Sequence, residues 1–156
     1  MNVYRLRVSI IGFANCYRII EATENCTFDD LHDTIFEAFD RYDLHLYSFF
    51  ITRSDTRSLQ TIYQAPEVTH SSNLEGMVGD HTMRRSSATT TLGSVGLAPK
   101  EVIHYLFDFG DDWWHRIRIQ SVGEVGGRRK RIRVIKAVGP SPPQYPDYDD
   151  DDDMDY

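Results

Sequence analysis

The stretch that decides the fold runs from residue 104 to residue 122 and reads HYLFDFGDDWWHRIRIQSV. Aromatic and β-branched residues dominate both of its halves, which is typical of strands. Residues 104–109 therefore predict one strand, residues 110–112 a tight turn, and residues 113–122 the returning strand. Alternation along this hairpin predicts that one sheet face carries five apolar side chains, namely Phe107, Phe109, Trp113, Ile117 and Ile119.

The N-terminal third of the chain predicts a hairpin, a helix and a further strand. Residues 4–10 alternate between apolar and polar side chains, and residues 16–20 return the chain after a turn. Thr27 can cap a helix, with Asp30 three positions later as in a capping box, and apolar residues then recur at helical spacing. Residues 46–51 form a short aromatic stretch that predicts a buried strand.

The remaining segments set the domain organisation. Residues 53–91 show no persistent apolar face and predict an irregular insertion, whereas residues 128–138 predict another strand. The aspartate run within residues 144–156 predicts a disordered acidic tail. We therefore expect one α+β domain over residues 1–143. Its sheet should be mixed or antiparallel, with one main helix packed across it in a β-grasp-like arrangement.

The overall composition places the chain among ordinary folded proteins. Of its 156 residues, 40% are hydrophobic and 26% are charged, which excludes wholesale disorder and a collagen-like fibre. No apolar run approaches the ~18 residues that a membrane-spanning helix needs, and the N-terminus lacks the apolar core of a signal peptide. Two cysteines provide neither a disulfide framework nor a tetrahedral zinc site. We expect a cytoplasmic protein with reduced thiols.

The net charge of −7 conceals three blocks of unlike sign. Residues 1–112 carry nine basic and sixteen acidic side chains, whereas residues 113–136 carry eight basic side chains against Glu124 alone. Residues 137–156 carry seven aspartates and no basic residue. Because local electric fields select partners, the basic block between two acidic blocks is more informative than the total charge.

The basic block predicts a cationic sheet face. Alternation after Trp113 places Trp114, Arg116 and Arg118 opposite the apolar side chains, and the next strand begins among further basic residues. If these two strands pair, arginines face arginines, which is unfavourable unless an anion is supplied. Nucleic-acid phosphates would supply that anion, with Trp114 available for base stacking, and so would the protein's own aspartate tail. A solvated face whose repulsion is screened by salt is the alternative.

A second candidate site surrounds the central turn. The side chains concerned are Asp108, Asp111, Asp112 and His115. Carboxylates and an imidazole crowded at a turn could bind a divalent metal ion or support acid–base chemistry. The alternative is that the aspartates hydrogen-bond the turn backbone while His115, which shares a face with Trp113 and Ile117, is a core histidine. The sequence leaves both open.

Three stretches together resemble a known family. They are TFDDLHDTI at residues 27–35, DLHLYSF at residues 43–49 and YLFDFGDDWWH at residues 105–115. The chain resembles the plasmid pRiA4b ORF-3-like family over about residues 1–52 and 92–143. Members are small bacterial, archaeal or mobile-element proteins, some named as resolvase-like passengers of transposons. The resemblance implies no catalytic mechanism, and the chain shows no serine or tyrosine recombinase constellation.

The function predicted from these features is a non-enzymatic binding module that associates with nucleic acid. The residues expected to bind it are Trp114, Arg116, Arg118, Arg128, Arg131 and Arg133. The acidic tail is expected to compete for the same basic face. The alternatives are a metal-dependent hydrolase built on the Asp/His turn cluster and a protein–protein interaction module that uses the insertion at residues 53–91.

Overall fold

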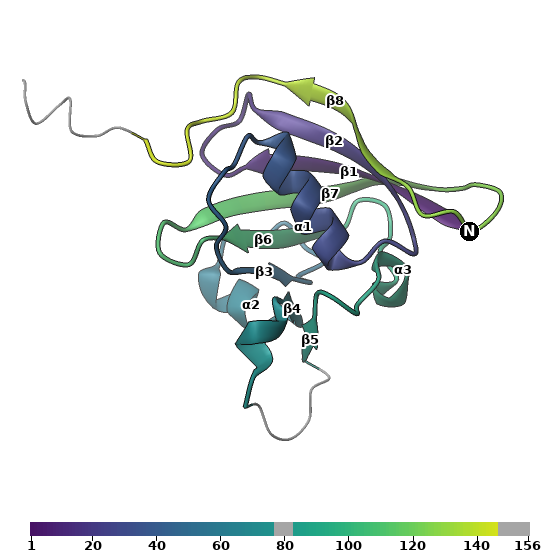
Figure 1. Ribbon diagram of the computed structural model, residues 1–156, viewed down its shortest axis with the longest axis horizontal. Helices are drawn as coiled ribbons and strands as arrows, with labels where there is room; N and C mark the ends of the chain where they lie inside the picture. Colours follow the sequence, from purple (N-terminus) through teal and green to yellow (C-terminus); the bar gives the residue numbers. More distant parts are fainter. Residues whose placement is uncertain (77–82, 147–156) are drawn as a thin grey trace, which may run out of the picture.

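The computed structural model describes residues 1–76 and 83–146, and its framework is an eight-stranded sheet (Figure 1). The strands are β1 (Asn2–Ile10), β2 (Tyr17–Thr23), β3 (Tyr47–Phe50), β4 (Glu67–Thr69), β5 (Arg84–Ser86), β6 (Val102–Phe107), β7 (Trp113–Glu124) and β8 (Ile132–Val138). Their order across the sheet is β5-β4-β3-β6-β7-β1-β2-β8, antiparallel throughout except for the parallel pair β4 and β5. The predicted α+β fold with a mixed sheet is therefore confirmed.

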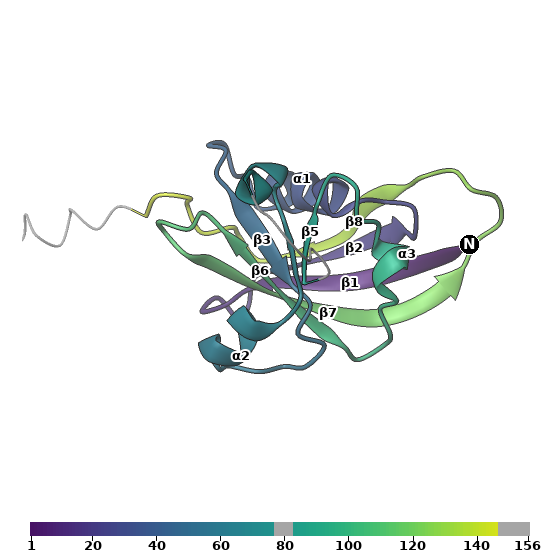
Figure 2. The same cartoon turned by 90° about the horizontal axis from the view of Figure 1, so that it is seen from below.

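The helices lie on both sides of this sheet. They are α1 (Phe28–Ala38), α2 (Leu59–Gln64) and α3 (Leu92–Val95), together with the 3₁₀ helix η1 (Ser71–Leu74). Figure 2 shows α1 on one side of the sheet and α2 on the other. The β-grasp-like arrangement with a single main helix is not confirmed, because short helices accompany α1 and the sheet is wider than predicted. Within the described residues, no helix has the length and apolarity needed to cross a membrane.

Helix α1 begins and packs as the sequence predicts. Thr27 accepts a hydrogen bond from the Asp30 backbone N–H, and the Asp30 carboxylate accepts one from the Thr27 N–H, so the capping box is complete. The apolar side of the helix buries Phe28, Leu31 and Ile35 against the sheet. The main hydrophobic core therefore lies between α1 and one sheet face. The opposite sheet face does not pack against α1.

The predicted pairing of the two basic strands is wrong. Strand β7 pairs with β1, and β8 pairs with β2, so the N-terminal hairpin lies between them. The loop at residues 125–131 crosses the ends of that hairpin, where backbone hydrogen bonds join Val125 to Met1 and Thr23 to Arg131. The backbone groups on both outer edges of the β1–β2 hairpin need hydrogen-bonding partners. The seven-residue loop is long enough to carry the chain from one edge to the other, so that β7 pairs with β1 and β8 pairs with β2.

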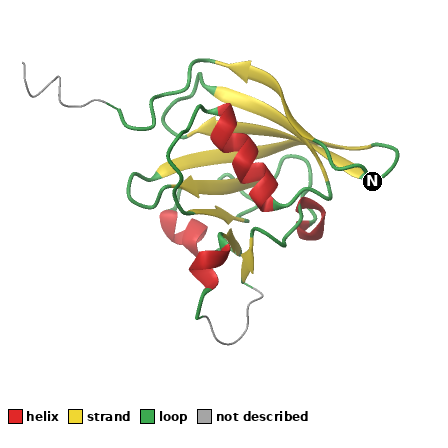
Figure 3. Ribbon diagram, in the orientation of Figure 1, coloured by secondary structure: helices red, strands yellow, loops and turns green. Residues whose placement is uncertain are grey.

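Two further predictions need correction. The insertion at residues 53–91 is not irregular throughout, because it contains α2, β4 and β5, and these strands extend the sheet beyond β3 (Figure 3). Strands of three residues are too short to show an alternating pattern in the sequence. Phe109 does not belong to the apolar sheet face, since it is 44% exposed. The strand ends at Phe107. The next residue, Asp108, turns the chain with a φ of +66°, and its carboxylate accepts the Gly110 and Asp111 N–H groups.

The start of the predicted acidic tail packs against the fold. Gln144, which the sequence placed in the acidic tail, is buried, and its amide oxygen accepts the backbone N–H groups of Tyr42 and Asp43. Its amide nitrogen donates to the Asp43 carbonyl. The rest of the predicted tail, residues 147–156, lies outside the described residues.

Gly139 marks a tight approach between two segments of the chain. Its φ is +78°, and a Cβ atom there would lie 2.2 Å from the backbone oxygen of Asn15. We expect Gly139→Ala to reduce the free energy of unfolding by roughly 2–4 kcal/mol, because it adds this clash to a left-handed backbone conformation. Urea denaturation measures the change.

Gly127 provides the matched control for that substitution. Its φ is +75°, but a Cβ atom there would meet no atom within 4 Å. Gly127→Ala should therefore lower the free energy of unfolding by only about 1 kcal/mol. Equal losses in the two variants would contradict the close approach of Gly139 to Asn15.

Candidate functional site

The sheet face opposite α1 carries a groove of about 1110 Å³. Side chains from β1, β6 and β7 line it, together with α2 and the segment just before α2. Among the residues that the structure describes, five basic side chains line this groove, against the single carboxylate of Asp55. They are Arg7, Arg57, Lys100, Arg116 and Arg118. We call it the cationic groove.

The floor of the cationic groove contains two arginines that face each other. Arg7 on β1 and Arg118 on β7 are directly opposite in the antiparallel register, so their side chains leave the same sheet face. Across residues 1–76 and 83–146, neither forms an ion pair with a carboxylate. The Arg7 guanidinium lies 3.8 Å from the centre of the Tyr17 ring, which attracts the cation without neutralising it. Like charges at directly opposed positions of a sheet are unfavourable, and an anion bound by both side chains would offset this repulsion.

Arg116 differs from this pair because it has an internal partner. Its guanidinium donates two hydrogen bonds of 2.7 Å to the Asp55 carboxylate, a bidentate pair. The bond to Arg116 lowers the pKa of Asp55, and the same bond raises the pKa of Arg116. Both groups are therefore charged at neutral pH. The Asp55 carboxylate marks a position where an anionic oxygen fits against the groove wall.

His104, opposite Arg116 on β6, adds no further charge. It is buried, and its Nδ1 atom lies 2.7 Å from the Thr52 hydroxyl. Burial lowers the pKa of His104, so this ring is neutral at physiological pH. Within residues 1–76 and 83–146, the positive charge of the groove therefore comes from the arginines and Lys100.

The other end of the groove is apolar. Trp114, Ile62, Leu59 and Ile11 line it, and Leu59 and Ile11 are largely exposed. The Trp114 ring packs against Phe50 and Tyr63, with 5.8 Å between ring centres in both cases. These contacts hold the indole against α2 at the side of the groove. The groove thus combines cationic and aromatic surface.

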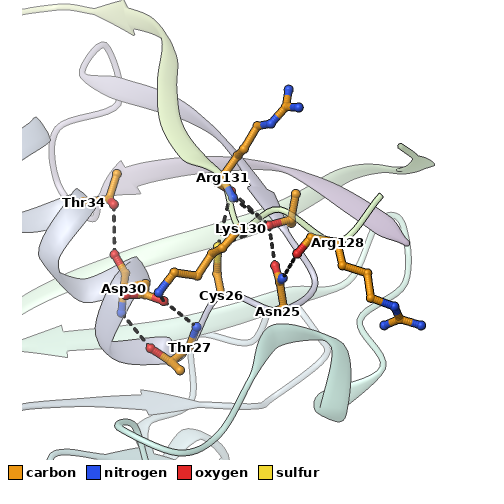
Figure 4. A network of polar contacts seen from close by, with 9 residues as sticks. Asn25, Cys26, Thr27, Asp30, Thr34, Arg128, Lys130 and Arg131 are labelled. Atoms are coloured by element: carbon orange, nitrogen blue, oxygen red, sulfur yellow. Dashed lines mark hydrogen bonds and ion pairs between the residues drawn. The ribbon is translucent and has the colours of Figure 1, made fainter. Parts of the chain in front are cut away.

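The other predicted nucleic-acid contacts lie elsewhere. The groove lining includes none of Arg128, Arg131 and Arg133. Figure 4 shows the guanidinium groups of Arg128 and Arg131 pointing away from each other at the β7–β8 loop. Arg133 on β8 lies 3.4 Å from the carboxylate of Glu21, which also pairs with Arg5. The structure therefore brings together Trp114, Arg116 and Arg118, and separates them from the other three.

The β7–β8 loop is fixed to the fold by a polar network, which Figure 4 shows. Lys130 forms a 3.1 Å ion pair with Asp30 in the capping box of α1. The Asn25 side chain donates to the Arg128 carbonyl, and the Thr23 hydroxyl accepts the Arg131 N–H. The basic block therefore has a structural role at this end of the molecule.

The predicted metal site is not assembled. His115 is buried in the core face beneath α1, with its Nδ1 atom 2.9 Å from the Trp113 carbonyl oxygen. Asp108 holds the turn backbone, while Asp111 and Asp112 are exposed at the turn. In the part of the chain that the structure describes, no group of three His, Cys, Asp or Glu side chains could hold a metal ion. The alternative of turn aspartates and a core histidine is what the structure shows.

A buried polar cluster beneath α1 was not predicted. Asp29 accepts hydrogen bonds from the hydroxyl groups of Tyr47 and Ser87, and Nδ1 of His32 lies 2.6 Å from the Tyr105 hydroxyl. The His32 ring also stacks on Tyr47, with 3.6 Å between centres. Burial lowers the pKa of His32 to about 4. The helix dipole explains an aspartate in the first turn of α1, but only folding brings Tyr47 and Ser87 to it.

These features define a class: a small α+β protein with a helix on one sheet face and a cationic groove on the other. Comparison with known proteins identifies the family. The chain belongs to the plasmid pRiA4b ORF-3-like protein family, whose profile matches residues 2–145. No curated protein matches the chain.

A solved structure shares the fold. It is the crystal structure of a protein of unknown function, MM3350, from Methanosarcina mazei Go1. The TM-score is 0.62 at 23% sequence identity, and the match covers 92% of this chain and 72% of that one. At this sequence identity, the structural similarity supports the fold of this chain alone.

Proposed function

We propose that this protein is a non-enzymatic binding module whose cationic groove takes single-stranded nucleic acid. The observation that carries the proposal is the facing pair Arg7 and Arg118, which has no carboxylate partner in the described residues. A backbone phosphate bound by both side chains would offset their repulsion and accept hydrogen bonds from both guanidinium groups.

The apolar end of the groove favours nucleic acid over a small inorganic anion. A single strand offers phosphates for the arginines and unstacked bases for an aromatic surface such as that of Trp114 and Tyr63. A duplex keeps its bases stacked and paired, so it cannot use that surface in the same way. We therefore expect single strands to bind more tightly than duplexes of the same length.

Salt titration of oligonucleotide binding tests the proposal. Four basic side chains of the groove lack an ion pair in the described part of the protein. If each contacts one phosphate, the logarithm of affinity should fall linearly with the logarithm of salt concentration, with a slope of about −3. Fluorescence anisotropy of a labelled single-stranded oligonucleotide, in DNA and RNA forms, measures this slope.

A duplex of the same length is the control. Tighter binding of the duplex would contradict the role of the aromatic end, and absence of binding to either form at low salt would remove the proposal. The acidic tail, residues 147–156, lies outside the described residues, so its competition for the groove stays a prediction.

A further inference from the structure

A second surface gathers at the end of the sheet where three turns meet. The α1–β3 loop exposes Tyr42, Leu44 and Leu46, and Leu44 is 79% exposed. The β6–β7 turn adds Phe109, and the segment after β8 adds Tyr145. In Figure 1 these segments lie together at the left of the molecule, and Figure 2 agrees. We call this surface the turn-end patch.

Contacts between the loops make the turn-end patch continuous. The Tyr145 ring packs against Tyr42 with 5.8 Å between centres, and its hydroxyl lies 2.8 Å from Nε2 of His45. The Asp108 N–H donates to the Leu46 carbonyl, which joins the β6–β7 turn to the α1–β3 loop. The apolar side chains therefore belong to one surface rather than to scattered positions.

A hollow of about 490 Å³ extends this surface towards the β1–β2 turn. Ile11 and Phe13 line it from that turn, and both are exposed. Trp113 and Tyr145 line it from the other side, and the Phe13 and Trp113 ring centres are 6.0 Å apart. The patch thus offers a depression for an apolar side chain, as interaction sites commonly do.

The exposed aspartates of the turn-end patch are not matched by an exposed lysine or arginine in the described part of its loops. Its loops carry the exposed carboxylates of Asp40, Asp43, Asp111 and Asp112. The only arginine in these loops, Arg41, is buried beside the Trp113 ring, and they contain no lysine. Within the described residues, none of the four aspartates forms an ion pair with a basic side chain.

We propose that the turn-end patch binds a cationic amphipathic segment of a partner protein, with apolar side chains in the hollow and lysines or arginines against the aspartates. Charge complementarity selects this occupant. The chain's own aspartate tail, nucleic acid and anionic lipid all carry the same sign as the aspartates of the patch, so they are repelled. The inference differs from the proposal for the cationic groove in the sign of the charge that it uses, although Ile11 and Trp114 line both the groove and the hollow.

Peptide titration tests this inference on the full chain. The probe is a synthetic peptide of lysine and leucine with the leucines on one helical face, and the readouts are fluorescence of Trp113 and Trp114 and calorimetry. Two matched peptides replace lysine by glutamate or leucine by serine. The lysine–leucine peptide should bind at least tenfold more tightly than either matched peptide. Only this peptide offers both apolar side chains to the hollow and positive charges to the aspartates.

Variants locate the binding surface. Leu44→Asn with Phe109→Asn removes apolar area, and Asp111→Asn with Asp112→Asn removes charge. Either pair should weaken the peptide at least fivefold. The controls, Val125→Asn with Val134→Asn and Glu75→Gln with Glu124→Gln, change exposed residues elsewhere and should weaken it less than twofold.

Three outcomes would overturn the inference. They are equal binding of the glutamate peptide, equal losses in the patch and control variants, and a stable dimer that dissociates when Leu44 and Phe109 are replaced. The last outcome, measured by sedimentation, would assign the patch to a second copy of the chain. Failure of oligonucleotide binding to the cationic groove would leave this inference unchanged.

Discussion

Replacing Arg7 and Arg118 together by alanine is expected to weaken single-stranded oligonucleotide binding by about tenfold or more at low salt. The two side chains leave the same sheet face from directly opposed positions and have no carboxylate partner in the described residues, so their loss removes two of the four basic groove side chains without an ion pair. The slope of log affinity against log salt should also become shallower, by about 1.4 for two lost phosphate contacts. Fluorescence anisotropy over a series of salt concentrations measures both quantities.

The β7–β8 loop provides the matched control for that variant. Arg128→Ala with Arg129→Ala removes the same charge at the other end of the molecule and should weaken binding less than about threefold. Asp55→Asn, which releases Arg116 from its internal carboxylate, should strengthen binding. A larger loss in the loop variant than in the groove variant would contradict the assignment of the groove.

Acid should destabilise the protein strongly between about pH 6.5 and pH 3. Burial lowers the pKa of His32 to about 4 and that of His115 to about 3. Both rings are buried, so the unfolded chain binds their protons at higher pH than the folded chain does. The contribution of each neutral ring to the free energy of unfolding is therefore fully present above the pKa of histidine in the unfolded chain. It is lost as the pH falls towards the lower pKa of the ring in the folded protein. The loss is about 3 kcal/mol for His32 and about 5 kcal/mol for His115, at roughly 1.4 kcal/mol per pKa unit.

Urea denaturation at a series of pH values measures this loss. His32→Gln, which can still hydrogen-bond Tyr105 but does not titrate, should flatten the dependence, and His45→Gln at an exposed site is the matched control. Histidine ring signals in NMR provide a measurement that needs no variant. A ring of His32 or His115 that titrates near pH 6.5 in the folded protein would contradict the account.

Local pattern was enough to predict most of the individual elements. The capping box at Thr27, the N-terminal hairpin and the hairpin around residues 110–112 depend on neighbours in the chain, and all three are present. The order of strands depends on contacts far apart in the sequence. Nothing in residues 128–138 indicates that β8 pairs with β2 instead of β7, because alternation specifies a face and not a neighbour.

The candidate site was predicted only in part, because some of its residues come together through contacts that are far apart in the sequence. Alternation along one strand correctly placed Trp114, Arg116 and Arg118 on the face opposite the core. Arg7 and Asp55 reach that groove only through strand pairing and through the chain segment before α2, so the sequence offered no local indication of them. The turn aspartates and His115 looked like a site because they are close in sequence, yet the turn separates the exposed carboxylates from the buried imidazole.

The most direct test of the central claim is photo-crosslinking of a single-stranded oligonucleotide that carries a halogenated uracil, followed by peptide mapping. We expect crosslinks in β7 at Trp114, which lines the apolar end of the groove, and in α2 at Tyr63, whose exposed ring packs against Trp114. Crosslinks confined to residues 125–131, or a crosslinking yield unaffected by the loss of Arg7 and Arg118, would contradict the account.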